Sequence, residues 1–430
     1  MVLCPSRLKK LPGRTNLTYA GKLTLAGLGL FACGAIGFAF QDAYKNDLPL
    51  DHPAIRYYQA PVNDPAARLN QKLEHGDVKL EFREGGLGYL PDLLKQLGIQ
   101  PDSQALVFSK TSFQASKISP RNPRAIYFSD DVAVGWVRGG DGFEIAAVDP
   151  NDGVVFYTLS IQKSDPPRIA RRDVCLKCHQ GSATLGVPGI FVGSVFPNPA
   201  GAPYRLDSII TDHRTAFADR WGGWYVNAKR GEQRDRANAV APDPADPEAL
   251  DSEGARNLTS LIRKFDPSGY LSPVSDIVAL MTFEHQTQMT NLITRLNWEQ
   301  RLGWKTDDDI AAMVEYMLFV DEAALAEPVE GVSKFTATFP ERGPRDRRGR
   351  SLRDFDLKTR LFRYPLSFMI YSAAFQALPA EVKQRVYRRL DEVLSGQDRS
   401  GKFTGISGDD RRAILEILHD TDPDWRRRAL

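Results

Sequence analysis

FEIAAVDPNDGVVFYTL, residues 143–159, contains two runs of β-forming residues joined by a turn. The runs Phe143–Val148 and Val154–Leu159 are rich in the β-branched and aromatic residues that strands prefer. The residues between them, DPNDG, are the types that turns use, because proline presets φ, glycine allows positive φ, and aspartate and asparagine bond their own backbone. The stretch therefore predicts a β-hairpin.

Three more strand-like runs precede this hairpin: ALVFS at 105–109, AIYFS at 125–129 and VAVGWV at 132–137. A turn-forming stretch, RGGDG, separates the last of them from the hairpin. Together these runs predict an antiparallel sheet over residues 100–162. Upstream, YLPDLLKQLG (89–98) predicts a short helix, and the Pro- and Asp-rich residues 44–70 predict an irregular arm.

Residues downstream of about 272 change to helical periodicity. In SPVSDIVALMTFEHQTQMTNLITRLNWEQ, Ser272 is a candidate N-cap with Pro273 at the first helical position, and apolar residues recur on one face. Further helices are predicted at 306–325, at 357–378 with an interruption at Pro365, at 379–396 and at 408–420. Between the sheet and these helices, residues 186–204 predict two short strands around a Pro/Gly turn.

The N-terminus differs from the rest of the chain. Arg7, Lys9, Lys10 and Arg14 precede an uncharged apolar run, Leu23–Phe40. A basic flank followed by an apolar run is typical of a secretory signal, and the length of this run also fits a membrane anchor. We therefore expect residues 1–43 to be a signal peptide or an anchor, which gives a periplasmic or other extracytoplasmic protein with possible membrane association through residues 23–40.

The cysteines are few and their spacing is informative. Cys4 and Cys33 belong to the leader, so the exported part contains only Cys175 and Cys178, followed directly by His179 in CLKCH. A C-x-x-C pair can form a redox disulfide, and zinc would need about four ligands, for which no second pair is present. C-x-x-C-H is the pattern of covalent haem attachment, because two thiols form thioethers with the porphyrin edge and the adjacent imidazole binds iron. The sequence predicts one c-type haem, attached by the c-type maturation machinery, with His179 as the proximal ligand.

The second axial position has several candidate ligands. His285 is the preferred one, because it lies on the apolar stripe of the predicted 272 helix, one turn from Met281 and one turn from Met289. The alternatives are His213, His52, Met281, Met289 or an open position. Arg171 and Arg172 could pair with haem propionates. The basic run ERGPRDRRGR (341–350) predicts a solvated loop or, alternatively, a docking site for an acidic redox partner or anionic lipid.

Several segments resemble one family of exported bacterial proteins that contain a cytochrome c domain. The segments are SQALVFSKTSFQ, NPRAIYFSDDVAVGWV, VCLKCHQGSATLGVPG, RWGGWYV and FRYPLSFMIYS, and the similarity extends from about His52 to Asp420. The resemblance implies one covalently bound haem and does not imply an activity. Relatives have histidines just after RWGGWYV, where this chain reads NAKRGEQRDRAN.

These observations predict an α+β fold, with an N-terminal antiparallel sheet region followed by a mostly helical C-terminal bundle that encloses the haem. The predicted regions are 1–43, 44–170 and 171–430, the last of which includes the attachment segment.

The preferred function is electron transfer with an unidentified redox partner. Because a simple carrier needs only about 100 residues, a haem enzyme or a sensor of peroxide, oxygen or another small molecule is the alternative, and a haem-bearing subunit of a respiratory complex is a third. The net charge of +2 and the lack of nucleotide-binding or hydrolase motifs give no support to nucleic-acid binding or to those chemistries.

Overall fold

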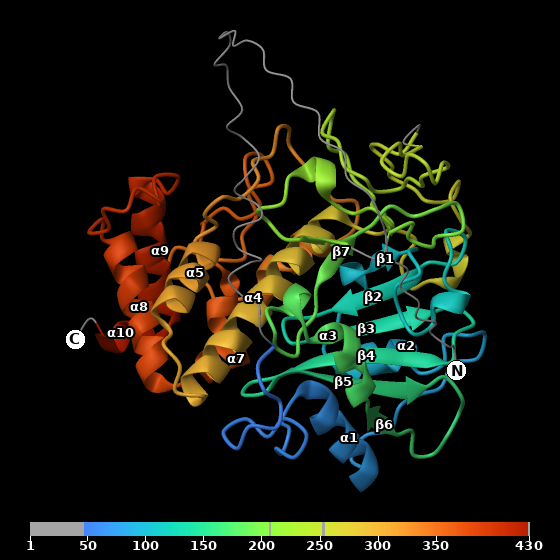
Figure 1. Ribbon diagram of the computed structural model, residues 1–430, viewed down its shortest axis with the longest axis horizontal. Helices are drawn as coiled ribbons and strands as arrows, with labels where there is room; N and C mark the ends of the chain where they lie inside the picture. Colours follow the sequence, from blue (N-terminus) through green and yellow to red (C-terminus); the bar gives the residue numbers. More distant parts are fainter. Residues whose placement is uncertain (1–46, 206–207, 252–253, 429–430) are drawn as a thin grey trace, which may run out of the picture. The chain divides into compact units, whose positions relative to one another are not determined.

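The predicted hairpin lies one strand in from an edge of a seven-stranded antiparallel sheet in the computed structural model, which describes residues 47–205, 208–251 and 254–428 (Figure 1). The strands, in chain order, are β1 (Ala105–Val107), β2 (Arg124–Phe128), β3 (Val132–Val137), β4 (Gly142–Asp149), β5 (Gly153–Ser160), β6 (Ile169–Arg171) and β9 (Trp224–Tyr225). Their spatial order is β6-β5-β4-β3-β2-β1-β9. Val148 pairs with Val154 beside the turn, as the hairpin prediction requires.

The two faces of this sheet differ in chemistry. One face is fully buried and carries Tyr127, Val134, Trp136, Ile145 and Tyr157. The other face, which we call the open face, carries Ile126, Gly135, Glu144, Ala146, Phe156 and Thr158 on β2 to β5. Most of these side chains are small or only partly buried. One face of the sheet is therefore apolar and packs against the core, and the other is more polar and only partly covered.

Helix α1 (Pro65–His75) covers part of the apolar face, where it contacts β4 and β6. The prediction of an irregular arm over 44–70 was wrong at this point. Asp64 accepts hydrogen bonds from the backbone N–H groups of Ala66 and Ala67, and Pro65 occupies the first helical position. Both features are ordinary helix-start signals. Helix α2 (Leu90–Gln96) confirms the short helix predicted at 89–98.

Helix α4 (Ile277–Arg301) runs between the sheet and the other C-terminal helices (Figure 1). It begins at Ile277 with Asp276 as N-cap, so the predicted start at Ser272 was wrong. The side chain of Gln104 donates to the carbonyls of Ser272 and Val274, both at 2.7 Å. These bonds hold the preceding segment beside β1, and the backbone turns into the helix only after it.

The remaining helices follow in chain order. They are α5 (Asp307–Met317), α6 (Phe335–Thr338), α7 (Ala373–Gln376), α8 (Ala380–Leu394), α9 (Gly408–Thr421) and α10 (Pro423–Arg428). Helices α8 and α9 confirm the predictions at 379–396 and 408–420, and α5 is shorter than predicted. The long helix predicted at 357–378 is absent from the described structure. Phe355 and Phe362 instead form a β-bridge, and Pro365 separates it from the short turn that precedes α7.

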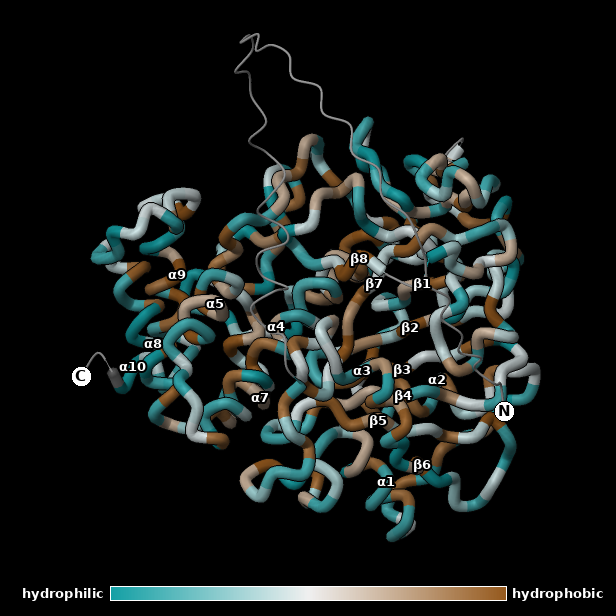
Figure 2. The backbone as a smooth tube through the Cα atoms, viewed as in Figure 1, coloured by the Kyte–Doolittle hydropathy of each residue, from teal (hydrophilic) through white to brown (hydrophobic). Residues whose placement is uncertain are grey.

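The antiparallel sheet in the N-terminal half and the helices in the C-terminal half confirm an α+β fold. The region boundary predicted near residue 170 lies within the sheet, because β6 and β9 form its two edges. Strands β7 (Val192–Ser194) and β8 (Ile209–Thr211) form a separate pair, so the second strand predicted within 186–204 lies later in the chain. Hydrophobic residues concentrate in the central strands, while peripheral loops are mostly hydrophilic (Figure 2).

The predicted signal peptide or anchor lies outside the described residues. Among the residues that are described, no helix is long and apolar enough to span a bilayer.

Candidate functional site

The CLKCH motif forms one helical turn beside the open face of the sheet. Cys175 ends a short 3₁₀ turn, and helix α3 (Leu176–His179) follows it directly. Arg172 fastens this turn to β5, because its Nε donates to the hydroxyl of Thr158 at 2.8 Å. Cys175 is half-buried, Cys178 is exposed, and neither is in a disulfide. The motif therefore presents two free thiols at the protein surface.

Burial affects the protonation of both ends of this turn. It raises the pKa of the Cys175 thiol, with the Glu144 carboxylate as a further cause. It also lowers the pKa of His179 to about 4. His179 is therefore a neutral imidazole at pH 7, which is the form that binds metals.

The ring of His179 is held in one orientation. Its Nδ1 lies 3.0 Å from the carbonyl oxygen of Gly189, and this carbonyl can only accept, so Nδ1 carries the proton. The ring centroid lies 4.8 Å from that of Phe156 on the open face and 5.6 Å from that of Phe191. No protein group among the described residues forms a hydrogen bond with Nε2. The lone pair of Nε2 is thus free for another partner.

An ion pair lies on β2 and β4 near this ring. Arg124 Nη2 is 2.6 Å from Glu144 Oε2, and both side chains are about one-fifth exposed. Arg124 lowers the pKa of His179 and Glu144 raises it, although both effects are smaller than that of burial. The polar end of the open face is therefore electrostatically coupled to the histidine.

His285 has a different environment from the one that the sequence predicted. It is fully buried on α4, its Nδ1 lies 2.9 Å from Nδ1 of His213, and its Nε2 lies 2.7 Å from Oγ of Ser367. Its ring stacks on Phe319 at 4.4 Å and on Tyr316 at 5.2 Å. Both ring nitrogens thus have protein partners, which argues against a role as the distal ligand. Burial lowers the pKa of both histidines, so both are neutral at pH 7.

None of the other proposed ligands forms a hydrogen bond or ring contact with His179 among the described residues. His52 is exposed, and its Nδ1 accepts from the backbone N–H of Ala54 at 3.2 Å. Met281 and Met289 are buried members of the core of α4. In the described part of the chain, no three His, Cys, Asp or Glu side chains are arranged to hold a metal ion.

No protein-family model, curated protein or solved structure matches this chain. The resemblance stated from the sequence therefore remains an expectation.

The RWGGWYV segment forms a buried polar cluster with α4 that the sequence did not predict. Trp221 Nε1 donates to one carboxylate oxygen of Glu284 at 2.9 Å, and Arg220 donates to the other at 3.3 Å. Arg220 also donates to the carbonyl of His213 at 2.9 Å. Just after this segment, Arg230 forms a buried ion pair with Asp235 at 2.8 Å. Glu284 lies directly before His285 in the sequence. A charged residue on a helix that is predicted to be buried needs a partner, so Glu284 could have indicated this cluster.

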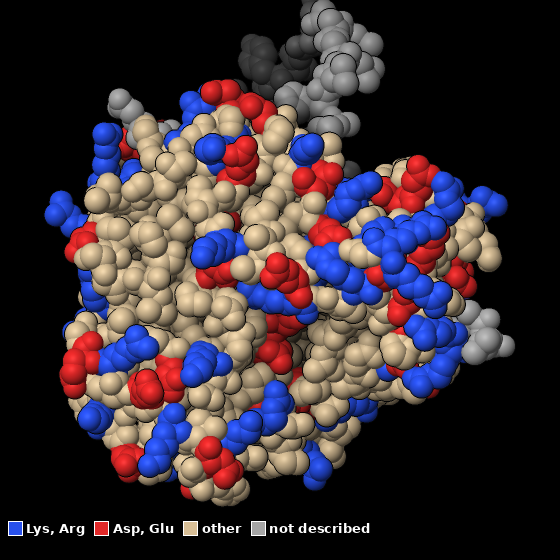
Figure 3. Space-filling model, turned by 180° about the vertical axis from the view of Figure 1, so that it is seen from behind, with Lys and Arg blue, Asp and Glu red and all other residues tan. Residues whose placement is uncertain are grey.

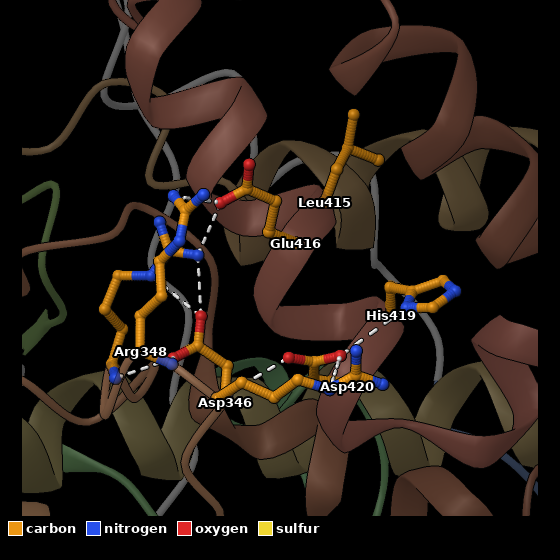
Figure 4. Close-up of a pocket in the computed structure, with 8 residues that line it drawn as sticks. Asp346, Arg348, Leu415, Glu416, His419 and Asp420 are labelled. Atoms are coloured by element: carbon orange, nitrogen blue, oxygen red, sulfur yellow. Dashed lines mark hydrogen bonds and ion pairs between the residues drawn. The ribbon is translucent and has the colours of Figure 1, made fainter.

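The basic run at 341–350 borders a hollow of about 420 Å³ against α9 (Figure 4). Its arginines are paired with acids, because Arg348 and Arg350 lie 2.9 and 2.6 Å from Glu416. Lys and Arg are also interspersed with Asp and Glu over the back of the molecule (Figure 3). The pairing favours the prediction of a solvated loop over that of a docking site for an acidic partner.

Proposed function

We propose that this chain is an exported c-type cytochrome with one covalently attached haem, and that it transfers electrons. One observation carries the proposal. The protonated Nδ1 of His179 is held by the Gly189 carbonyl, its Nε2 has no protein hydrogen-bond partner among the described residues, and two free thiols lie within the same turn.

The residues of the site fit such a group. Cys175 and Cys178 would form the two thioethers, and Nε2 of His179 would bind the iron. On the open face beside them, Ala146 and Phe156 form an apolar register pair next to the His179 ring, while the guanidinium of Arg124 lies over Gly135. When bound, haem supplies a one-electron iron couple whose potential depends on its axial ligands, burial and hydrogen bonding.

A second function is favoured by one observation. His285 was the preferred distal ligand, and both of its nitrogens have protein partners. If no other side chain takes the sixth position, that position is open to oxygen, peroxide or another small molecule. This arrangement supports the alternative of a haem enzyme or sensor.

Electron transfer to a partner protein requires that the surface next to the cofactor is exposed to solvent. The CLKCH turn has such a surface, because Val174 has 46% of its surface exposed and Cys178 is also exposed. Location outside the cytoplasm, the c-type maturation machinery and an unidentified redox partner are parts of the same proposal.

The test is expression together with a c-type maturation system. We expect haem to stay bound to the wild-type chain on a denaturing gel, and we expect none in the double variant Cys175→Ala/Cys178→Ala. Lys177→Ala is the matched control, because it changes an exposed residue between the cysteines and keeps the attachment pattern. A wild-type chain without covalent haem, or a double variant that keeps it, would contradict the proposal.

Spectra of the reduced protein with and without carbon monoxide then separate the two functions. An unchanged spectrum indicates two strong axial ligands and an electron carrier. A shifted spectrum indicates an open or displaceable position and supports the enzyme or sensor.

A further inference from the structure

One face of α4 is fastened to the loop that follows the CLKCH motif. We refer to residues 185–190 as the 185–190 loop. Arg295 Nη1 donates to the carbonyl of Leu185 at 2.6 Å, and Asn291 Nδ2 donates to the carbonyl of Ile190 at 3.0 Å. Because Asn291 and Arg295 are four residues apart, they lie on the same side of the helix. The helix thus holds both ends of this loop.

The same loop holds His179. The carbonyl of Gly189 accepts from Nδ1 of His179 at 3.0 Å, and the N–H of Gly189 donates to the carbonyl of His179 at 2.9 Å. Ile190, whose carbonyl is bonded by Asn291, is the next residue in the chain. A shift of the Asn291 amide would therefore displace the peptide that orients the imidazole.

Gly189 and Asn291 are in direct contact. A Cβ atom on Gly189 would lie 2.1 Å from Oδ1 of Asn291, so no larger residue fits at 189 without movement. Asn291 is fully buried. The glycine lets the backbone of the loop lie directly on the amide.

The amide of Asn291 is also incompletely satisfied. Its Oδ1 is buried and has no hydrogen-bond partner among the described residues. An unpaired buried polar atom destabilises a fold, whereas an apolar residue at this position would not. The contribution of this side chain therefore lies in the N–H that it donates to Ile190.

We propose that Asn291 is a positioning residue for the axial imidazole of His179, and that it acts through the Gly189–Ile190 peptide. This inference rests on the proposed haem attachment. Groups that hold the second nitrogen of a ligating histidine fix its orientation and raise its basicity. Loosening the hydrogen bond to the Gly189 carbonyl would make the imidazole a weaker donor to a bound iron, which would favour the reduced form.

The test compares midpoint potentials of haem-loaded wild type, Asn291→Ala and Asn291→Asp. The aspartate has the shape of asparagine but has no amide N–H to donate. We expect both variants to have a higher midpoint potential than wild type, and a shift of about 59 mV would correspond to a tenfold change in the one-electron equilibrium. Asn297→Ala is the matched control, because Asn297 is a buried asparagine of α4 with no hydrogen bond to the 185–190 loop among the described contacts.

The outcomes separate this inference from the proposed function. Potentials of both variants equal to that of wild type, or an equal shift in Asn297→Ala, would overturn the positioning role. Asn291→Ala leaves a cavity and Asn291→Asp buries a carboxylate, so the two variants can fail to fold for different reasons, and if one does not fold the other decides.

A second measurement does not need haem. In the full chain with both cysteines changed to alanine, the ¹⁵N signal of His179 reports the hydrogen bond of Nδ1. We expect Asn291→Asp to move this signal towards that of a free imidazole. An unmoved signal refutes the positioning role even if the chain never binds haem.

Discussion

Asp276 is the residue whose loss should weaken the described structure most clearly. Its side chain is buried at the start of α4 and accepts four backbone N–H groups. Oδ1 accepts from Val278 and Ala279 at 2.8 and 3.3 Å, which caps the helix. Oδ2 accepts from Val332 and Ser333, both at 2.7 Å, which fastens a loop to the helix start.

The cost of Asp276→Ala follows from these bonds. Loss of an N-cap costs about 1 kcal/mol. Each hydrogen bond to a charged group contributes about 1.5–3 kcal/mol, so the two loop bonds add about 3–6 kcal/mol. We expect the free energy of unfolding to fall by about 4–7 kcal/mol in total, which is a large part of the 5–15 kcal/mol typical of a domain. Asp276→Asn keeps one acceptor oxygen and should lie between wild type and alanine.

The assay is urea unfolding of the three proteins, followed by circular dichroism at 222 nm. Asp266→Ala is the matched control, because Asp266 accepts from the N–H of Ser268 at a largely exposed turn. We expect the control to change the free energy of unfolding by less than about 1 kcal/mol. A loss in Asp276→Ala as small as that of the control would refute the reasoning.

Two further predictions concern buried groups. Burial lowers the pKa of His285 to about 3, so below about pH 6.5 the unfolded chain binds a proton that the folded chain does not. Stability therefore falls as the pH is lowered from about 6.5 towards 3, and His285→Gln should flatten this slope by up to about 1.4 kcal/mol per pH unit in urea unfolding, whereas an unchanged slope would contradict it. A Cβ on Gly222 would lie 2.0 Å from the carbonyl oxygen of Val195, so Gly222→Ala should lower the free energy of unfolding by about 3 kcal/mol. Gly405→Ala, where nothing lies within 4 Å, should change it by less than about 0.5 kcal/mol, and equal losses would show that the backbone at Gly222 moves freely.

The elements that the sequence predicted correctly depend on neighbours in the chain. The β4–β5 hairpin forms from two runs of strand-forming residues and a DPNDG turn, and helices α8 and α9 form where helical segments were predicted. The CLKCH turn belongs to the same class, because its spacing alone places two thiols and an imidazole within one turn. These features need no information from distant residues.

The predictions that failed concern segments whose backbone groups form hydrogen bonds with residues distant in the sequence. Ser272 reads as a helix cap, but its carbonyl is bonded by Gln104, and the helix begins later. Residues 357–378 read as a helix, but the backbone N–H of Ser367 donates to Met317 at 2.8 Å and the preceding residues form a bridge. The first of these bonds joins residues 168 apart in the sequence and the second joins residues 50 apart, and neither can be inferred from local periodicity.

The candidate site shows the same division. The sequence by itself determined which reactive groups the CLKCH turn carries, namely two thiols and one imidazole. Only the tertiary structure decided which nitrogen of His179 is free, since that depends on the Gly189 carbonyl, and which partners occupy His285, since those are His213 and Ser367. The physical reason is that a side chain's identity is local, whereas its hydrogen-bond partners depend on which distant segments the fold brings against it.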